Sequence, residues 1–308
     1  MGTPDFAVLP LKVLVENHYN VVAVITMPDK PAGRGHKIQF SPVKQYALQQ
    51  QLPLLQPIKL KDPDFVDELS SYNADLQIVV AFRMLPEVVW SMPRFGTFNL
   101  HASLLPQYRG AAPINWAIIN GEKETGITTF FLEKGMDTGK IIQQVPVPIA
   151  ETDDFEIVHD NLMNLGSQLV LDTVEAILTD NVRPIDQASL PEINGELKPA
   201  PKIFKETCRI NWNQPVKRVY DFIRGLSPYP AARTVITNDK GEEVEIKVFK
   251  TDKEQCSAAV APGTVITDGK KELKIAAADG FIKIMSLQQA GKKRMQIEDF
   301  LRGFKVQH

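Results

Sequence analysis

The sequence predicts an α/β protein whose mostly parallel sheet is followed by a small antiparallel β-barrel. The first two-thirds of the chain alternate between apolar runs of strand length and segments with helical spacing, as an open α/β sheet requires. A stretch at 189–203 that is rich in proline and lacks periodicity then interrupts this pattern. Beyond it, short strand-like runs separated by turn signals are typical of a small barrel.

The length of the chain also indicates two domains. With 308 residues it exceeds the roughly 250–300 residues that one hydrophobic core usually supports. A hydrophobic content of 44% excludes a disordered protein. We therefore expect one domain over 1–188, a linker over 189–203 and a second domain over 204–308.

The elements of the first domain follow from local pattern. Residues 21–27 (VVAVITM) are apolar on both faces and predict a buried parallel strand. Ser41 followed by Pro42 is the start signal of a helix that continues to about residue 50. The remaining predictions are helices over 63–71, 113–120 and 153–179, and strands over 76–82, 96–100 and 126–132.

The second domain is predicted to combine one amphipathic helix with several short strands. Val216, Val219, Phe222 and Ile223 share one face of a helix over 215–226. The strands are expected over 234–236, 243–249, 263–266, 272–276 and 281–284, with Asn-Asp and Asp-Gly turns between several of them.

The charges divide at the linker. The whole chain has 35 Lys and Arg against 37 Asp and Glu, a net charge of −2, which argues against a bulk nucleic-acid binder because non-specific affinity for phosphates needs excess positive charge. Residues 1–200, however, hold 15 basic and 24 acidic side chains, and residues 201–308 hold 20 and 13. An acidic half of −9 thus precedes a basic half of +7.

Membrane and secretory classes are not expected. No apolar run approaches the roughly 20 residues of a membrane span, and the first residues lack the basic start of a signal peptide. The two cysteines, Cys208 and Cys256, form neither a disulfide framework nor a metal quartet, which fits a reducing compartment. We expect a cytoplasmic protein with no membrane association.

The densest cluster of chemistry-bearing residues is the run FNLHASLLPQYRG at 98–110. In an extended strand Asn99 and His101 share a face, at the carboxyl edge where open α/β sheets bind ligands. An Asn amide can stabilise a developing oxyanion, and imidazole exchanges protons near neutral pH. Asp137, in a glycine-flanked loop after the next predicted strand, is the candidate to orient the imidazole.

Taken singly, these residues have ordinary explanations. A histidine after a strand and an Asp-Thr-Gly turn are more often structural than catalytic. A metal centre is less favoured than either role, because the five histidines show no ligand spacing and His101 has no second His or Cys within a helical or strand repeat.

The wider sequence around this cluster resembles a known family. The run FNLHASLLPQYRGAAPINWAI, followed by MDTG at 136–139, resembles the formyltransferases that use 10-formyltetrahydrofolate. Further segments resemble the members that act on methionyl-tRNA, and the resemblance covers essentially the whole chain. These segments are GTPDFA at 2–7, PDKPAGRG at 28–35, SPVK at 41–44, IRGLSPYP at 223–230 and GKKRM at 291–295.

The resemblance implies the fold, the reaction and several residue roles. It implies a Rossmann-like formyltransferase domain followed by an OB-like barrel that binds tRNA. The implied reaction moves the formyl group of 10-formyltetrahydrofolate to the α-amino group of methionine on initiator methionyl-tRNA, without a metal or a covalent enzyme intermediate. Asn99, His101 and Asp137 match the family's catalytic residues. The folate-contacting segment is matched by Ser103, Leu104, Leu105 and Pro106.

Two basic clusters are the expected tRNA contacts. By charge alone such stretches are more often solvated surface, but the resemblance favours a loop that enters the acceptor stem and a barrel that forms an electrostatic platform. Arg34 is expected to contact nucleotides and the lysines to contact phosphates. The loop residues are Lys30, Arg34, Lys37 and Lys44, and the barrel residues are Lys292, Lys293 and Arg294. We expect the protein to act as a monomer.

The start of the chain departs from the family pattern. Family members have a hydrophobic strand before the GTPDFA segment, whereas this chain begins at Met1 and Gly2. Without that central strand we expect exposed apolar neighbours and unpaired backbone groups, and we expect an added upstream strand to raise the melting temperature. Residues 81–86 also lack the family's usual glycine, which alters the far wall of the folate pocket.

Two other functions remain open from the sequence. One is formylation of a small amine, such as a sugar nucleotide or glycinamide ribotide, although such enzymes have less reason to carry both basic clusters. The other is a non-catalytic tRNA-binding protein on a formyltransferase scaffold, which the presence of Asn99, His101 and Asp137 disfavours. Incubation with methionyl-tRNA and 10-formyltetrahydrofolate separates the three.

Overall fold

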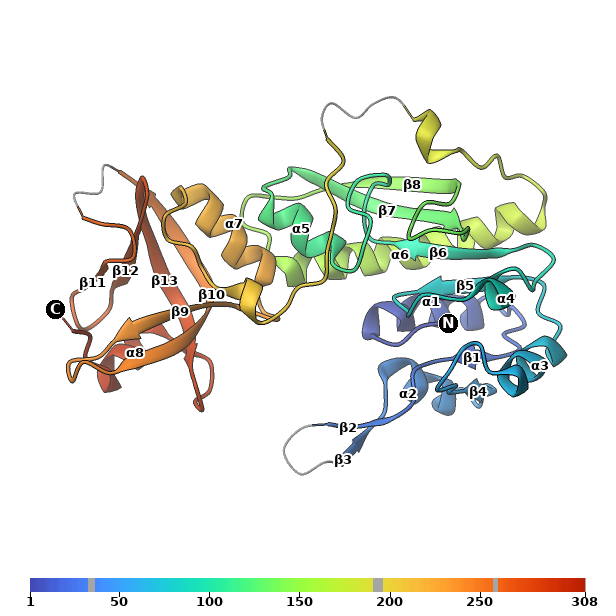
Figure 1. The fold of residues 1–308 in the computed structure, drawn as a ribbon, viewed down its shortest axis with the longest axis horizontal. Helices are drawn as coiled ribbons and strands as arrows, with labels where there is room; N and C mark the ends of the chain where they lie inside the picture. Colours follow the sequence, from blue (N-terminus) through green and yellow to red (C-terminus); the bar gives the residue numbers. More distant parts are fainter. Residues whose placement is uncertain (33–36, 191–195, 257–259, 308) are drawn as a thin grey trace. The chain divides into compact units, whose positions relative to one another are not determined.

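The computed structural model describes residues 1–32, 37–190, 196–256 and 260–307 (Figure 1). The chain divides into two compact units, each built from more than one stretch of sequence. The first unit comprises Met1–Gly110, Thr125–Val147 and His159–Pro199, and the second comprises Ala111–Glu124, Pro148–Val158 and Ala200–His308. None of the helices in the described ranges is both long and apolar enough to cross a bilayer.

The first unit contains the predicted α/β sheet. Its strands follow the order β5 (Gln77–Val80), β6 (Thr97–His101), β7 (Glu124–Phe131) and β8 (Ile141–Pro148). β5 and β6 run parallel, whereas β6 and β7 are antiparallel. A second parallel pair consists of β1 (Val24–Ile25) and β4 (Leu54–Leu55). The α/β class and the strand expected over 96–100 are thus confirmed.

The first two residues lie between the two parallel pairs, where the N-terminus is marked in Figure 1. The Gly2 amide donates to the Ile25 carbonyl oxygen at 3.0 Å, and Gly2 also bridges to Val80 of β5 in parallel. The Met1 amino group donates to the Ile78 carbonyl oxygen at 2.7 Å. Backbone hydrogen bonds of Met1 and Gly2 therefore connect β1 to β5.

A cavity of about 460 Å³ lies beside this junction. Its walls come from β1, β5, α1 (Val8–Glu16) and α6 (Phe155–Leu178), with mostly apolar side chains. Apolar side chains of β1 and β5 therefore line a cavity, whereas Met1 and Gly2 pair backbone groups that were expected to be unpaired. The cavity also explains why only Val24 and Ile25 pair as a strand in the range 21–27, since one flank of that segment borders it.

The predicted helices of the first two-thirds are confirmed. They are α2 (Pro42–Gln49), α3 (Pro63–Ser71), α5 (Pro113–Ile119) and α6. The start of α2 follows the expected capping chemistry, because the Ser41 hydroxyl oxygen accepts a hydrogen bond from the Lys44 amide at 3.1 Å.

Other elements escaped the sequence pattern. η1 (Asp5–Ala7) and α1 begin the chain, and Pro10 in the first turn of α1 disguised that helix, although a proline is tolerated there. β8 contains Pro146 and Pro148, which suit a strand at the end of a sheet and were not recognised as part of one. The short α4 (Glu87–Trp90) was also not predicted.

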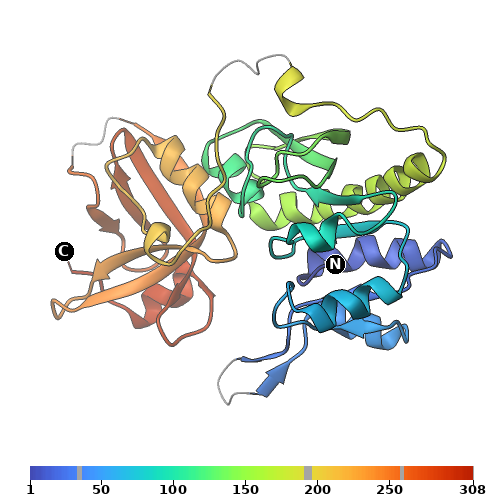
Figure 2. The same ribbon diagram turned by 45° about the vertical axis from the view of Figure 1, so that its right-hand side comes forward.

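The expected basic loop is in part a hairpin. β2 (Lys30–Ala32) and β3 (Lys37–Gln39) pair antiparallel, with Lys30 opposite Gln39. Figures 1 and 2 show the two strands running out from the body of the first unit. Residues 33–36, which include Arg34, lie outside the described residues.

The second unit contains the predicted antiparallel sheet. Its strands follow the order β11-β12-β13-β10-β9, with β14 also paired to β13, and every pairing is antiparallel. The sheet curls into the barrel-like form expected for this half (Figure 1). The strands are β9 (Ala232–Thr237), β10 (Glu243–Gln255), β11 (Val265–Thr267), β12 (Leu273–Ala277), β13 (Gly280–Gln289) and β14 (Met295–Gln296).

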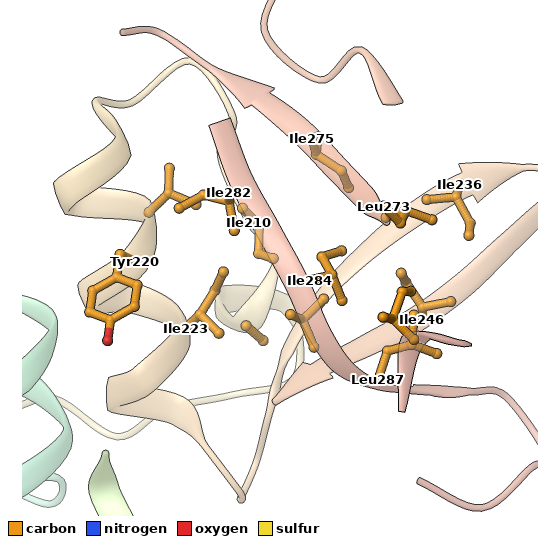
Figure 3. Packing of buried hydrophobic residues seen from close by; sticks show 14 of the residues in the cluster. Ile210, Tyr220, Ile223, Ile236, Ile246, Leu273, Ile275, Ile282, Ile284 and Leu287 are labelled. Atoms are coloured by element: carbon orange, nitrogen blue, oxygen red, sulfur yellow. The ribbon is translucent and has the colours of Figure 1, made fainter. Parts of the chain in front are cut away.

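The core of this unit lies between the curled sheet and its helices. Figure 3 shows Ile223 of α7 (Val216–Leu226) among sheet residues that include Ile246, Leu273 and Ile284, all of them fully buried. α8 (Ile297–Gly303) adds Phe300 to the same cluster. Burial of these aliphatic side chains stabilises the unit.

The glycine of the IRGLSPYP segment is explained by the packing of α7 against α5. A Cβ on Gly225 would lie 2.8 Å from Ile119 Cγ1 and 3.1 Å from the Asn115 carbonyl oxygen, so only glycine permits this approach. The Asn115 side chain donates to the Gly225 carbonyl oxygen at 2.7 Å. The preceding Arg224 is buried and pairs with Asp221 at 2.8 Å.

Candidate active site

The end of β6 carries the two residues predicted to act on the substrate. Asn99 and His101 are two positions apart on the strand, so their side chains leave the sheet on the same face. His101 is 6% exposed and lies edge-on to the Phe130 ring. Asn99 is half-buried, and among the residues that the structure describes its amide has no hydrogen-bond partner. That amide is therefore available to a ligand.

The imidazole of His101 is held by one ring nitrogen. Nε2 lies 2.9 Å from the Tyr108 carbonyl oxygen. A carbonyl only accepts, so Nε2 carries the proton and donates it in this contact. Nδ1 faces the carboxylate of Asp137, with 3.9 Å between Nδ1 and Oδ2. This geometry leaves Nδ1 as the nitrogen that exchanges a proton, with a negative charge beside it.

Asp137 lies in the loop that follows β7, as predicted, and the structure brings it to His101. Its Oδ2 accepts a hydrogen bond from the Gly110 amide at 3.0 Å, which fixes the carboxylate. The residue has a φ of 54°, a left-handed conformation uncommon outside glycine. Gly139 in the same MDTG motif passes so close to β7 that a Cβ there would lie 1.7 Å from the Phe131 carbonyl oxygen.

A buried glutamine ties the Asp137 loop to the loop that carries Gly110. Gln187, at the start of η2 (Gln187–Ser189), is 4% exposed. Its Nε2 donates to the carbonyl oxygens of Asp137 and Gly139 at 2.9 and 2.8 Å. Its Oε1 accepts from Arg109 Nε and Nη2 at 3.1 and 2.6 Å. No sequence pattern marks this residue, which lies just before the predicted linker.

The predicted folate-contacting segment packs against β7 and β8. The Thr128 hydroxyl donates to the Ser103 carbonyl oxygen at 2.6 Å, and the Leu105 amide donates to Thr128 Oγ1 at 3.2 Å. Gln144 Nε2 donates to the Leu105 carbonyl oxygen at 2.9 Å. The side chains of Ser103, Leu105 and Pro106 are buried, whereas Leu104 is half-buried. A ligand at this segment would therefore meet backbone groups and Leu104. Sequence reasoning missed Thr128 and Gln144, for which the sequence offers no distinguishing signal.

The structure also locates the predicted tRNA-contacting residues. Lys44 is 9% exposed, and its ammonium group pairs with Asp29 and donates to Gln56 Oε1 at 2.8 Å. The hydrogen bond from Lys44 lowers the pKa of the Asp29 carboxyl group. Lys30 and Lys37 lie on the β2–β3 hairpin. Lys44 is therefore held at the base of this loop by its ion pair with Asp29 and its hydrogen bond to Gln56.

The barrel cluster occupies the turn between β13 and β14. Lys292, Lys293 and Arg294 are exposed. The Arg294 guanidinium lies over the Phe249 ring, 4.5 Å from its centroid, and donates to Ser286 Oγ at 3.0 Å. Its charge thus has a fixed position, whereas the two lysines extend from the turn.

The segment at 81–86 is anchored by Arg83. Its guanidinium donates to the carbonyl oxygens of Pro57 and Ile58, the latter at 2.7 Å. Burial lowers the pKa of this guanidinium. Within the described ranges, no three His, Cys, Asp or Glu side chains are grouped closely enough to hold a metal ion.

Comparison with known proteins decides the family. Residues 1–174 match the family profile described as formyl transferase, and residues 202–305 match the profile of the formyl transferase C-terminal domain. The chain belongs to the formyl transferase family. The matched ranges include every element that carries Asn99, His101 and Asp137.

The curated relatives of this formyl transferase extend along nearly its whole length. The protein named methionyl-tRNA formyltransferase from Bacteroides thetaiotaomicron is 68% identical over 306 residues, which is 99% of this chain and 95% of that protein. The one from Flavobacterium johnsoniae is 52% identical over 303 residues, 98% of this chain and 94% of that protein.

Solved structures at lower identity share the fold. An N-formyltransferase from Helicobacter canadensis, in complex with folinic acid and dTDP-3-aminofucose, has a TM-score of 0.66 at 21% identity and covers 94% of this chain and 97% of its own. HypX from Aquifex aeolicus, in complex with tetrahydrofolic acid, has a TM-score of 0.58 at 21% identity, over 84% of this chain and 44% of its own. Both likenesses confirm the fold class of this formyl transferase.

Proposed function

We propose that this chain transfers the formyl group of 10-formyltetrahydrofolate to the α-amino group of methionine on initiator methionyl-tRNA. One observation carries the proposal: the end of β6 sets Asn99 and His101 beside Asp137, in a chain 68% identical over nearly its full length to a protein named methionyl-tRNA formyltransferase. The co-substrate supplies the formyl carbon and, at N10, the leaving nitrogen.

The residues present fit that reaction. The Asn99 side chain leaves the sheet on the same face as His101, so its amide can donate to the oxygen that becomes negative as the amine attacks the formyl carbon. The new C–N bond forms to methionine, and the bond to N10 breaks. His101 Nδ1 takes up a proton from the attacking amine and returns it to the leaving nitrogen. Asp137, 3.9 Å away, stabilises the imidazolium between these steps.

The folate segment and the basic clusters support the choice of substrates. Ser103, Leu104, Leu105 and Pro106 present a backbone held by Thr128 and Gln144, next to the His101 loop. Lys30, Arg34 and Lys37 of the hairpin region, with Lys292, Lys293 and Arg294 of the barrel, supply positive charge for tRNA phosphates. Lys44 contributes by holding Asp29 at the base of the hairpin.

The proposed organisation follows the sequence boundaries. A formyltransferase domain over 1–188 and a tRNA-binding domain over 204–308 are joined by the linker at 189–203. The protein acts as a monomer in the cytoplasm, where translation begins. Light scattering coupled to gel filtration tests the monomer, with a mass near 34.4 kDa as the expected result.

One assay tests the function. The purified chain is incubated with methionyl-tRNA and 10-formyltetrahydrofolate, the aminoacyl ester is hydrolysed, and formylmethionine is detected by mass spectrometry. Parallel reactions offer an amino sugar nucleotide and glycinamide ribotide in place of the tRNA. Formylmethionine from the first reaction supports the proposal. Turnover of a small amine alone, by protein that is folded, overturns it.

A further inference from the structure

We infer that Gln187 is a positioning residue for the proposed reaction, because it fixes the loop that presents Asp137 to His101. The inference rests on the proposed function and deepens it. Gln187 does not contact His101. It acts through the backbone of Asp137, whose carboxylate is the group facing the imidazole.

Every hydrogen-bond donor and acceptor of the Gln187 side chain has a partner. The amide nitrogen has two protons, which reach the carbonyl oxygens of Asp137 and Gly139. The amide oxygen has two lone pairs, which accept both bonds from Arg109. At 4% exposure no water replaces these partners, so each lost bond leaves a buried polar group unpaired. Glutamine is therefore a specific requirement, since glutamate cannot donate and a shorter amide does not reach.

The two loops that Gln187 joins are the two that hold the carboxylate. Arg109 immediately precedes Gly110, whose amide donates to Asp137 Oδ2 at 3.0 Å. The left-handed backbone at Asp137 costs conformational energy that the surrounding contacts must offset. Gln187 bonds on both sides of Thr138 and thereby maintains that conformation. Loss of Gln187 releases the carboxylate from His101 while leaving every reacting group in the protein.

A double-mutant cycle tests this inference. Gln187→Leu is expected to lower kcat for formyl transfer about 10-fold to 100-fold, with KM for methionyl-tRNA nearly unchanged. In an Asp137→Asn background the same substitution is expected to have little further effect, because the carboxylate that it positions is already gone. Gln187→Leu is also expected to shift the pH profile of kcat in the same direction as Asp137→Asn. Equal effects of Gln187→Leu in both backgrounds would overturn the inference.

A matched control separates positioning from general stability. Gln77 of β5 is another buried glutamine of the same unit, 6% exposed, whose Oε1 accepts from Thr97 Oγ1. Gln77→Leu is expected to change the melting temperature but not the pH profile of kcat. If Gln77→Leu also shifted the pH profile of kcat, loss of any buried amide would explain the effect of Gln187→Leu, and the inference would be overturned.

Hydrogen exchange provides a readout that needs no substrate. The Gly110 amide is protected by Asp137 Oδ2, so Gln187→Leu should accelerate its exchange, whereas Gln77→Leu should not. Unchanged exchange at Gly110 would overturn the inference even in an active enzyme. If exchange is accelerated in Gln187→Leu but the unaltered chain does not formylate methionyl-tRNA, the positioning role is retained and the proposed function is rejected.

Discussion

His101, the last residue of β6, combines two properties that the proposed chemistry requires. It is almost fully buried, and each of its ring nitrogens faces a different group: the Tyr108 carbonyl at Nε2 and the Asp137 carboxylate at Nδ1. The first contact fixes the ring and the proton on Nε2. The second places a negative charge beside the nitrogen that exchanges protons.

Replacing this imidazole tests its chemical role directly. His101→Ala is expected to lower kcat/KM for formyl transfer by about 10²–10⁴-fold, because the group that moves the proton from the amine to the leaving nitrogen is lost. Binding of methionyl-tRNA, measured by filter retention, should remain nearly unchanged, since the basic clusters are intact. Activity within a few-fold of the unaltered chain would contradict the assigned role.

At the scale of single elements, α7 depends on a buried ion pair. Asp221 is 1% exposed and Arg224 is 6% exposed, and the Arg224 guanidinium also donates to the Asp153 carbonyl oxygen at 2.7 Å. Lys217 provides a second, partly exposed partner to Asp221. Such a pair adds little net stability, but removing one partner leaves an uncompensated buried charge.

Asp221→Ala is therefore expected to reduce the free energy of unfolding by about 3–5 kcal/mol, measured by urea denaturation. The matched control is Asp299→Ala in α8, where Asp299 and Arg302 form an exposed pair with the same spacing. Its expected cost is at most about 1 kcal/mol. Similar losses in both variants would show that burial does not decide the energetics of α7.

The edges of β1 and β5 are arranged to accept another strand. Val24 and Thr26 donate to carbonyl oxygens on the β4 side, so the Ile25 amide points to the opposite flank. On β5, Val80 donates to the Met1 carbonyl oxygen at 2.9 Å, and Ile78 is the next residue that faces the same way. Both edges border the cavity of about 460 Å³.

Fusing about five apolar, β-branched residues upstream of Met1 is expected to raise the melting temperature, with each kcal/mol gained worth about 2–4 °C. The added strand would pair with both edges and bury the apolar cavity wall. An extension of equal length made of Gly and Ser is the control and should give no increase. An unchanged or lower melting temperature with the apolar extension would contradict the prediction.

For the whole molecule, a chain that starts at Met1 has a buried α-amino group, which links the stability of that chain to pH. Burial lowers its pKa from 8.0 to about 5. Between pH 8 and pH 5 the unfolded chain therefore binds a proton that the folded chain does not, so stability falls as the pH is lowered across this range. The loss reaches about 4 kcal/mol at most.

The apolar extension removes this amine from the cavity and provides the comparison. Urea unfolding at intervals from pH 5 to pH 8 should show a steeper decline in the original chain than in the extended chain. The difference between the two slopes isolates the amino group from the histidines, which both proteins share. Parallel slopes would show that the buried amine does not titrate as expected.

The opposite net charges of the two halves of the chain lead to a second prediction for the whole molecule. If the barrel cluster contacts tRNA phosphates, Lys292→Ala with Lys293→Ala should lower the slope of log affinity against log salt by on the order of 1 to 2. The matched control removes Lys59 and Lys61, two exposed lysines of the acidic half. Equal changes in both double variants would show that only total charge matters.

Much of the fold and part of the site could be predicted from the sequence. The helix over 63–71 and the strand around His101 follow from capping residues and two-residue periodicity, which are local signals. Gln187, Thr128 and Gln144 could not be found in this way, because their importance comes from backbone groups far along the chain. The charge of Lys44 is visible in the sequence, but its pairing with Asp29 is recognisable only in three dimensions.

The close approach at Gly225 has a consequence for the inheritance of this fold. α5 is early in the sequence, yet its Ile119 and Asn115 fit the bare backbone of α7 more than a hundred residues later. Recombination between two relatives at the stretch 189–203 would take α5 from one parent and α7 from the other. Such hybrids would inherit two unmatched helix surfaces within one core, so the two ends of the gene are expected to diverge together.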